Sequence, residues 1–417
     1  MTSREKLIKA LNHEEAPLAY DLGATKATGI NAIKLYKLRR LFGRDEPVKI
    51  YDTYQMLGLV DEQDAEMFGI DVLPAWSNYT CFGYKNNEWK PWTTPDGTPA
   101  LIGSDCAMSS KDGRIFIHPM GDISAPASGC MPRGGFYFDQ IVRQEPYDED
   151  DLDGLRDFAE DLAFYRLKDE TVRFYEDRVD DLYKNTDKGI VLNAEFCNLG
   201  AQTMVFGPCC RRTPGIRNYA DWLMAHLLYP EYLEEIYDAW VDTCIENLKL
   251  LYEAVGNKPQ AVFLCSTDFG TQKCEVISRD MYREFYFPRF KKVNDWVHEH
   301  TQWKTLFHCC GSITKIIGDM VEAGVDALNP IQTSAAGMDP VMLKETYGDR
   351  LTFWGGIVDC QTTISQGTPD DVEKELRERI AVFGKGGGLV GSVIHNLQYN
   401  TPDENILRAF EVLKEYR

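Results

Sequence analysis

Eight short apolar runs separated by helical segments constrain the fold of this chain most strongly. Each run is mostly apolar without strict alternation, which is typical of parallel strands covered on both faces. Eight strand–helix units predict a single (β/α)₈ TIM barrel. A doubly wound sheet is the alternative, but no Gly-x-Gly-x-x-Gly follows the first run to support it. The runs are PLAYDL (17–22), IDVLPA (70–75), IVLNAE (190–195), AVFLCS (261–266), KTLFH (304–308), VDALN (325–329), LTFWGG (351–356) and LVGSVI (389–394).

Amphipathic patterns between these runs predict the helices of the barrel. Two helix starts are explicit, at Thr368-Pro369-Asp370-Asp371 and Thr401-Pro402-Asp403-Glu404. Each places a threonine cap before a proline at the first helical position, with an acid at the third. The predicted helical segments are 169–184, 218–255 (two helices), 278–300, 312–322, 340–347 and 370–384.

Residues 80–148 interrupt the alternation of strands and helices. They are rich in glycine, proline, aromatic residues and turn signals, as in TPDGTPALIG and SSKDGRIFIHP. We expect β-hairpins inserted into one loop, forming a cap over one end of the barrel. With no linker or internal repeat, residues 1–417 are expected to form one elaborated domain.

The charge and cysteine content exclude several classes of partner. The net charge is −20, from 65 acidic and 45 basic residues, so nucleic acid is not an expected partner. No apolar stretch approaches the length of a membrane-spanning helix, and the first residues, MTSREKLIKALNHEE, lack an apolar signal core. Twelve cysteines without a regular framework then predict free thiols in a cytoplasmic protein.

Polar residues capable of catalysis or metal binding follow six successive strands, from the third to the eighth. In a TIM barrel the loops after the strands meet at one face, which carries the active site. Two of the seven histidines are among these residues. The sequence therefore predicts one site at this face. Its candidate residues are Glu195, Asp268 in STDFGTQ, His308 and Cys310, Asn329 and Gln332, Asp359 with Cys360, and His395 with Asn396.

The stretch FHCCG, which ends at Gly311, is the strongest metal signal. Side chains at i and i+2 of an extended segment share a side, so His308 and Cys310 can converge while Cys309 points away into the core. Imidazole and thiolate together suit zinc. Burial of an ordinary histidine and cysteine is the alternative. Cys209-Cys210 is a competing thiol pair, although adjacent cysteines do not easily bind one tetrahedral metal.

The C-terminal half resembles the uroporphyrinogen decarboxylase superfamily. The blocks that carry the resemblance lie in order within residues 261–412: VFLCSTDFGTQKCEVISRDMYREFYFPRFKKV, LFHCCGSITKIIGDMVEAGVDALNPIQ, FWGGIVDCQTTISQGTPDDV and HNLQYNTPDENILRAFE. The start, REKLIKALNHEEAPLAYDLG, is a weaker match. The resemblance implies a (β/α)₈ barrel, in agreement with the periodicity.

The superfamily contains two chemistries, and the sequence favours one of them. Decarboxylases that act on a tetrapyrrole with many carboxylates carry an arginine-rich segment after the first strand, where this chain reads LGATKATGINAI with only Lys26. The other branch contains zinc-dependent methyltransferases that work with corrinoids, including coenzyme M methyltransferases and O-demethylating enzymes. Their ligand pattern is His-x-Cys and a further ligand, usually Cys, before the last helix.

The resemblance implies that His308, Cys310 and His395 bind the zinc. His395 stands where the family usually has cysteine, so it could instead hydrogen-bond substrate while Glu195, Asp268 or Cys360 binds the metal. Zinc accepts all of these donors.

We expect the remaining strand-end residues to act on the substrate. Asp268 and Gln272 would orient it, and Glu195 would donate a proton or add a metal ligand. Aromatic residues near the insertion could shelter an apolar substrate: Tyr79, Trp89, Trp92, Phe136 and Tyr137. The expected substrate-binding residues are Asn329, Gln332, Asn396 and Arg211.

The sequence thus predicts a zinc-dependent methyltransferase that moves a methyl group between a small methylated molecule, such as an aryl methyl ether, and a corrinoid. The chain has no Asp-x-His-x-x-Gly sequence, so the methylcobalamin-type corrinoid is expected on a partner protein. One alternative is a metal-independent decarboxylase of a small or tetrapyrrole acid, with Arg211 or Arg212 as the carboxylate clamp. The other is a non-catalytic module that binds metal or corrinoid.

Overall fold

A nearly closed sheet of eight parallel strands forms the centre of the molecule in this computed structural model, which describes all 417 residues. The strand order is β1-β16-β15-β14-β13-β12-β11-β4, and each hydrogen-bonded pair is parallel. At the seam between β1 and β4, the Asp71 N–H donates to the carbonyl oxygen of Tyr20 (2.8 Å), and the Tyr20 N–H donates to the Asp71 carboxylate (3.0 Å). The strands are β1 (Ala19–Tyr20), β4 (Val72–Ala75), β11 (Gly189–Asn193), β12 (Ala261–Cys265), β13 (Lys304–His308), β14 (Ala327–Asn329), β15 (Thr352–Trp354) and β16 (Leu389–Gly391).

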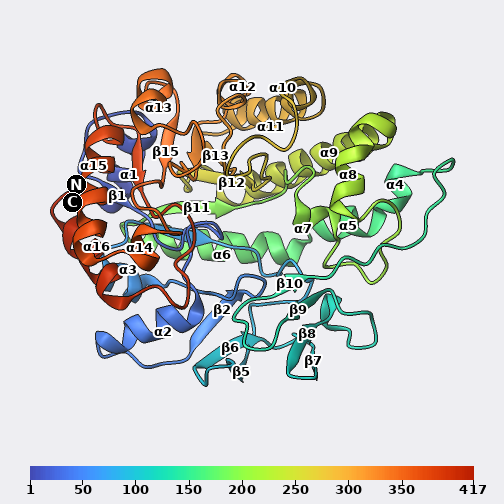
Figure 1. Cartoon of the computed structure of the whole chain (residues 1–417), viewed down its shortest axis with the longest axis horizontal. Coiled ribbons are helices and arrows are strands. Elements are labelled where there is room, and N and C mark those ends of the chain that lie inside the picture. Colours follow the sequence, from blue (N-terminus) through green and yellow to red (C-terminus); the bar gives the residue numbers. More distant parts are fainter.

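Each of the eight predicted runs forms one barrel strand, so the prediction of a (β/α)₈ barrel is confirmed. Helices surround the sheet (Figure 1). They are α3 (Glu62–Phe68), α6 (Asp169–Asn185), α8 (Tyr219–Leu228), α9 (Pro230–Val255), α10 (Arg279–Met281), α11 (Phe287–His300), α12 (Ile317–Glu322), α13 (Pro340–Tyr347), α15 (Pro369–Phe383) and α16 (Asp403–Lys414). None of them combines the length and the apolar character that crossing a lipid bilayer requires.

Helix α1 (Ser3–Leu11) covers one end of the barrel. Leu7 and Leu11 of this helix join a buried apolar cluster with residues from the barrel strands, among them Val72, Val191 and Trp354. The start of each parallel strand lies at this end. The loops after the strands therefore gather at the opposite end, where chemistry is expected.

Local signals placed one of the two explicit helix starts correctly. Thr368 and Asp371 form a reciprocal capping box at the start of α15. At α16 the N-cap residue is Pro402 and no side chain caps the helix, so the prediction of a Thr401 cap is wrong. The buried Thr401 instead turns back, and its N–H donates to the carbonyl of Gln398 (3.2 Å). The helix consequently begins one residue later.

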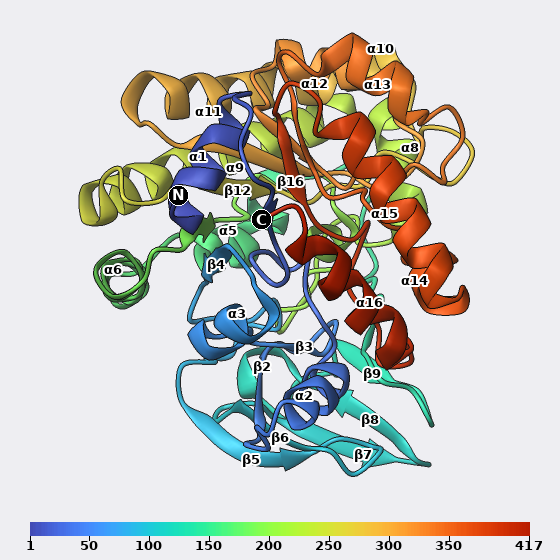
Figure 2. The same cartoon turned by 90° about the vertical axis from the view of Figure 1, so that its left-hand side faces the viewer.

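Residues 89–140 contribute strands β5 to β10 to two small sheets beside the barrel (Figure 2). One sheet has the order β3-β2-β6-β5 and the other β10-β9-β8-β7. Strand β2, from the segment after the first barrel strand, pairs in parallel with β6, so residues before position 80 also belong to these sheets. The strands are β2 (Val48–Asp52), β3 (Leu57–Gly58), β5 (Trp89–Thr93), β6 (Pro99–Gly103), β7 (Met108–Lys111), β8 (Arg114–Ile117), β9 (Gly129–Met131) and β10 (Asp139–Gln140).

Short helices connect these parts of the molecule. The remaining helices are α2 (Ala32–Leu41), a 3₁₀ turn at Pro119–Gly121, α4 (Gly154–Asp157), α5 (Ala159–Tyr165), α7 (Gln202–Val205), a π-helical turn at Tyr282–Tyr286 between α10 and α11, and α14 (Thr363–Gln366).

All twelve cysteines are free.

Candidate metal centre

Three metal-binding side chains converge at the carboxyl ends of the strands. His308 is the last residue of β13, Cys310 lies two residues further, and His395 follows β16. One donor atom of each lies within 4.8 Å of the others. The Nε2 atom of His308 is 3.2 Å from the Sγ atom of Cys310. The imidazole rings of His308 and His395 pack edge to face, with their centroids 5.5 Å apart. The structure thus brings together the residues that the sequence indicates as zinc ligands.

Asn329 fixes the orientation of the His308 ring. The side-chain Nδ2 of Asn329 donates to the carbonyl oxygen of Trp354 (2.9 Å), which leaves Oδ1 to accept from the Nδ1–H of His308 (2.6 Å). With its proton on Nδ1, the imidazole presents the lone pair of Nε2 toward Cys310. Such a partner is the usual device for holding a metal-binding histidine. His308 and Asn329 face each other because they pair in the register of β13 and β14.

Burial determines the protonation of the other two donors. It lowers the pKa of His395 to about 4, with the neighbouring His308 acting in the same direction. The neutral imidazole that results is the form that binds metals. Burial also raises the pKa of the Cys310 thiol, and the Asp268 carboxylate adds to this effect. Cys310 is therefore a neutral thiol without a cation, whereas a bound cation would favour its thiolate.

The loop after β12 supports the loop that carries Cys310. The carboxylate of Asp268 accepts from the Cys310 N–H (2.7 Å) and lies 3.6 Å from Nε2 of His308. Gly311 has a φ of +91°, and a Cβ there would lie 2.5 Å from the backbone of Gly270. A side chain at position 311 would push the two loops apart. Glycine is thus required where the loops cross.

Three amide side chains that we expected to bind substrate form hydrogen bonds with other parts of the protein. Asn329 contacts His308 and Trp354, as described. Gln332 accepts from the Gly311 N–H (2.8 Å), and its Nε2 donates to Gln272 (3.1 Å).

The third of these amides, Asn396, joins the loop after β16 to the loop after β1. Its Oδ1 accepts from the Gly29 N–H (2.5 Å), while its Nδ2 donates to the carbonyl of Lys26 (2.9 Å) and to Gln55 (2.8 Å). All three amides are buried, so they support the loops around the metal donors.

Glu195 and Lys26 form an ion pair in the same cleft. The carboxylate of Glu195 lies 3.3 Å from Nζ of Lys26 and accepts from Ser266 Oγ (3.1 Å) and Asn198 Nδ2 (3.4 Å). Burial, the largest influence, lowers the pKa of Lys26, but the charges of Glu195 and Asp52 outweigh it and raise the pKa overall. From the sequence, Lys26 was noted only as the single cation in the segment where decarboxylases carry several arginines, and it was not predicted as a site residue. Its signal was its position, just after the first strand.

Other candidates lie apart from the metal donors. Arg211 is about half exposed and pairs with Asp122 (3.0 Å), and Arg212 pairs with Glu145 (2.7 Å). Cys209 and Cys210 are buried with their sulfur atoms 3.8 Å apart, beside Asp161. That carboxylate is already paired with the buried Arg217. Because Arg211 and Arg212 are paired with these other carboxylates, neither serves as a cation next to His308 and Cys310.

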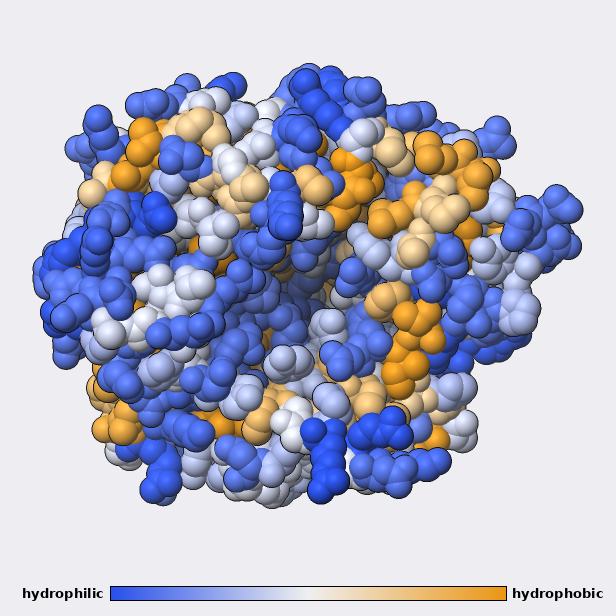
Figure 3. Space-filling model, viewed as in Figure 1, coloured by the Kyte–Doolittle hydropathy of each residue, from blue (hydrophilic) through white to orange (hydrophobic).

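Two cavities meet at His395. The central cavity, of about 440 Å³, is lined by Lys26, Glu195, Asp268, His308 and His395 among others. The outer cavity, of about 600 Å³, shares Tyr54, Gln55 and His395 with it and extends to Cys360, Tyr399 and residues 137–139 beside the barrel. Figure 3 shows the molecule hollowed near the centre of this face. His395 can therefore be reached from two sides.

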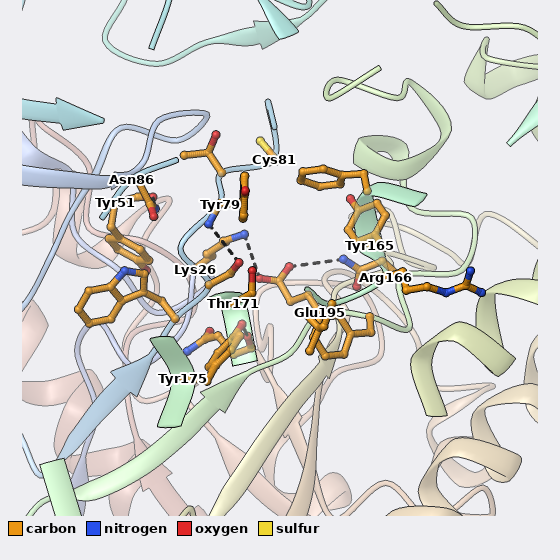
Figure 4. Close-up of a pocket in the computed structure, with 18 of the residues that line it drawn as sticks. Lys26, Tyr51, Tyr79, Cys81, Asn86, Tyr165, Arg166, Thr171, Tyr175 and Glu195 are labelled. Carbon is orange, nitrogen blue, oxygen red and sulfur yellow. Dashed lines mark hydrogen bonds and ion pairs between the residues drawn. The ribbon is translucent and has the colours of Figure 1, made fainter. Parts of the chain in front are cut away.

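The predicted aromatic residues are dispersed around these cavities. Tyr79 lines a further cavity that adjoins the central one, drawn in Figure 4, and Tyr137 lines the outer cavity. Phe136 stacks on Tyr399 with ring centroids 3.8 Å apart. Trp89 and Trp92 belong to β5 and line none of the three cavities.

Comparison with solved structures shows the same fold. A methyltransferase from Methanosarcina mazei superposes with a TM-score of 0.59 at 16% identity, covering 100% of this chain and 99% of that one. The endo-β1,6-glucanase BT3312 (TM-score 0.30, 11% identity, 60% and 62% coverage) is too distant to carry an argument. The same holds for the homocysteine methyltransferase MmuM from Escherichia coli (TM-score 0.27, 11% identity, 66% and 78% coverage).

Comparison of the sequence identifies the family. No curated protein matches the chain with significance. Residues 211–416 match the family model described as uroporphyrinogen decarboxylase (URO-D). This segment includes β12 to β16 and all three metal donors. Over residues 211–416 the chain belongs to the uroporphyrinogen decarboxylase superfamily.

Proposed function

We propose that this protein is a zinc-dependent methyltransferase that moves a methyl group between a small methylated substrate and the corrinoid of a partner protein. The convergence of His308, Cys310 and His395 in a family barrel is the observation that carries the proposal. The full-length similarity to a barrel described as a methyltransferase agrees with it but extends only to the fold.

The donor set fits zinc. Tetrahedral zinc places a nitrogen and a sulfur ligand about 3.5 Å apart, and His308 Nε2 and Cys310 Sγ are 3.2 Å apart. Three protein ligands leave one position for another molecule, as in catalytic zinc sites. When bound there, zinc would supply Lewis acidity at the atom that gives or receives the methyl group, or lower the pKa of a substrate thiol.

The residues of the chain would hold the reactants around this centre. Asn329 fixes the His308 ring, and Asp268 holds the Cys310 backbone while leaving about half of its own side chain exposed to the cleft. Asp268 is therefore placed to orient a substrate in the central cavity. Glu195 lies in the same cavity, where it can exchange a proton with substrate.

The outer cavity provides a separate approach for the corrinoid. It reaches His395 from the side of Tyr137 and Tyr399, away from Glu195 and Lys26. Two approaches that meet at His395 suit a transfer between a small substrate and a large corrinoid. Alignment of the reacting atoms by such a site supplies much of the rate of group transfer.

The decarboxylase alternative lacks its carboxylate clamp at this site. Arg211 and Arg212 are paired elsewhere, and Lys26 is opposed by Glu195 and Asp52. A substrate rich in carboxylates needs cations that are free to meet it. This observation favours methyl transfer over decarboxylation.

Metal analysis tests the first half of the proposal. Protein prepared without an affinity tag should contain about one zinc ion per chain. Cys310→Ala should lose most of the metal with an unchanged far-UV circular dichroism spectrum. Cys309→Ser is the matched control, because the Cys309 thiol is buried and accepts from the Phe269 N–H instead of facing His308. Full retention of zinc by Cys310→Ala would contradict the proposal.

A spectroscopic assay tests the second half. The protein is mixed with corrinoid proteins in the Co(I) state and with methoxylated aromatics, methylamines and methyl thioethers, and methylation is followed in the corrinoid absorption spectrum. His308→Ala should abolish the change, whereas His300→Ala, at an exposed position, should not. Release of CO₂ from a small acid by zinc-free protein would establish the decarboxylase alternative. Zinc binding without turnover of any of these compounds would indicate a binding module.

A further inference from the structure

The charges around the central cavity favour one sign of ligand. Its lining contains a single lysine or arginine, Lys26, and three carboxylates, those of Asp52, Glu195 and Asp268. Lys26 is already paired, because its Nζ lies 3.3 Å from Glu195 and 3.9 Å from Asp52. Arg166 and Lys168 line the smaller cavity drawn in Figure 4 and not the central one. The central cavity therefore offers a ligand no free lysine or arginine.

Asp268 is the carboxylate of this cavity without a cationic partner. Its Oδ1 accepts from the Cys310 N–H (2.7 Å), and no N–H or O–H group of the protein donates to Oδ2. The basic group beside it is the His308 imidazole, whose Nε2 lies 3.6 Å away. That imidazole holds its proton on Nδ1, against Asn329, and does not neutralise the carboxylate. The Asp268 side chain is 52% exposed, so its charge is open to a ligand.

A zinc ion in the neighbouring site would not reverse the charge of the central cavity. Zinc held by a Cys310 thiolate adds one net positive charge, since the thiolate cancels half of the charge of the ion. The three carboxylates of the lining exceed its single lysine by two charges. The excess charge is therefore negative with or without the metal. Clefts lined by one sign of charge concentrate ligands of the opposite sign.

Tyr219 is a second feature of the cavity that favours a cation. It is the first residue of α8, it is half-buried, and it lines the central cavity. Asn218 fixes the start of this helix by accepting from the Ala220 N–H (2.9 Å). Burial raises the pKa of Tyr219 to about 12, and the charge of Asp268 adds to this effect, so the carboxylate lies near the ring. The face of an aromatic ring attracts ammonium groups, more strongly where water is excluded.

We propose that the central cavity selects substrates that carry an ammonium group, which Asp268 and Tyr219 bind while the reacting atom faces the metal donors. This inference deepens the proposed function, on which it rests only in taking the ligand to be the methylated substrate. A substrate with a carboxylate, sulfonate or phosphate group would bring a second negative charge to Asp268 and meet no free cation. Selection by charge requires neither methyl transfer nor the metal.

Calorimetric titration with three compounds of similar shape tests the proposal. They are 2-(methylthio)ethylamine, a cation at neutral pH, 2-(methylthio)ethanol, which is neutral, and 2-(methylthio)ethanesulfonate, an anion. The protein should bind the amine about tenfold or more tighter than the alcohol, the effect of a hydrogen bond to a charged group, and the sulfonate most weakly. His308→Ala should keep this order. An amine that binds no more tightly than the alcohol, or no detectable binding of the amine, would overturn the proposal.

The corrinoid assay with the same compounds distinguishes this inference from the proposed function. Methyl transfer from the sulfonate in preference to the amine would support the proposed function and overturn the selection of a cation. Absence of methyl transfer from all three, with the order of affinities as expected, would contradict the proposed function and leave the cation site established.

Asp268→Asn tests the carboxylate without removing its structural bond. Asparagine keeps an oxygen for the Cys310 N–H, so zinc content and the far-UV circular dichroism spectrum should not change. Affinity for the amine should fall about tenfold, to that of the alcohol. Asp349→Asn, at an exposed carboxylate beside Arg350, is the control, since it changes the net charge equally and should not affect binding. Loss of zinc from Asp268→Asn, or equal weakening in the control, would contradict the proposal.

Tyr219 is tested through its ring. Tyr219→Phe keeps the ring and should bind the amine as the wild type does. Tyr219→Leu should weaken binding of the amine about two- to tenfold and leave the alcohol almost unaffected. Because α8 begins at this residue, the far-UV circular dichroism spectrum of both variants checks that the helix is retained. Equal affinity of the two variants for the amine would contradict the contact with Tyr219.

Discussion

Oδ1 of Asn329 lies 2.6 Å from Nδ1 of His308, on the neighbouring strand of the barrel. The asparagine cannot reverse its amide without losing the bond from its Nδ2 to the Trp354 carbonyl. One backbone carbonyl therefore determines which nitrogen of His308 faces Cys310. The orientation of the metal donor is built into three adjacent strands, β13, β14 and β15.

Replacing Asn329 by Ala should weaken zinc binding by about 10- to 100-fold, the usual effect of losing the partner of a metal-binding histidine. The His308 ring would then be free to rotate and to exchange tautomers. The measurement is competition for zinc against a chelator of known affinity. Asn329→Asp is the matched control, since it keeps an acceptor for the Nδ1–H and should retain more of the affinity than the alanine variant. Equal zinc affinity in wild type and Asn329→Ala would contradict the role assigned to Asn329.

Gly311→Ala should lower the free energy of unfolding more than Gly386→Ala does. Both glycines have positive φ, +91° and +73°, and alanine at such angles costs about 1–2 kcal/mol. At position 386 a Cβ meets nothing within 4 Å, whereas at position 311 it would lie 2.5 Å from the Gly270 backbone. Urea denaturation of both variants measures the difference between their free energies of unfolding. This difference reports the clash of the new Cβ with the backbone of Gly270. Equal destabilisation would show that the two loops separate freely.

The barrel could be predicted from the sequence because its strands are buried on both faces. Each strand is therefore a continuous apolar run that is visible in the local sequence. His308 and Cys310 were found for a similarly local reason, the alternation of side chains along an extended segment. Asn396 shows where this reasoning ends. Its position after a strand was clear, but its amide hydrogen-bonds Gly29 and Lys26, about 370 residues away along the chain, while the residue also lines the outer cavity. Sequence pattern alone does not indicate whether an amide faces a cavity or a neighbouring loop.

The stability of Asp21→Asn relative to wild type should rise with pH. Burial raises the pKa of Asp21 to about 6 from its ordinary 3.8, despite hydrogen bonds from Trp354 Nε1 (2.7 Å) and the Ala24 N–H (2.9 Å). The folded state thus binds the proton more tightly than the unfolded state. The favourable contribution of the protonated carboxyl is complete below pH 3.8 and is lost as the pH rises through about 6.

Asparagine does not titrate, so the comparison isolates this group. The free-energy difference between variant and wild type should shift in favour of the variant by about 1 kcal/mol between pH 5 and pH 7.5. Urea denaturation at both pH values measures it. If the asparagine side chain changes the strength of the hydrogen bond from the Ala24 N–H, this effect is the same at both pH values and cancels when the two free-energy differences are compared. A difference that is independent of pH would show that Asp21 has the same pKa in the folded and unfolded states.

Lys26 and Glu195 should be energetically coupled. Their charged atoms are 3.3 Å apart in a cleft where less than a third of either side chain is exposed. Lys26→Met leaves Glu195 and Asp52 without their cation, and Glu195→Gln leaves Lys26 with Asp52 alone, at 3.9 Å. A double-mutant cycle on the free energy of unfolding should therefore give a coupling of about 1 kcal/mol at low salt. The coupling should fall as salt is added, because part of the pair is reached by solvent. The same cycle on Lys26 and Asp403, which binds Lys34 instead, should give no coupling and is the control. Additive effects of Lys26→Met and Glu195→Gln would mean that the two charges act independently.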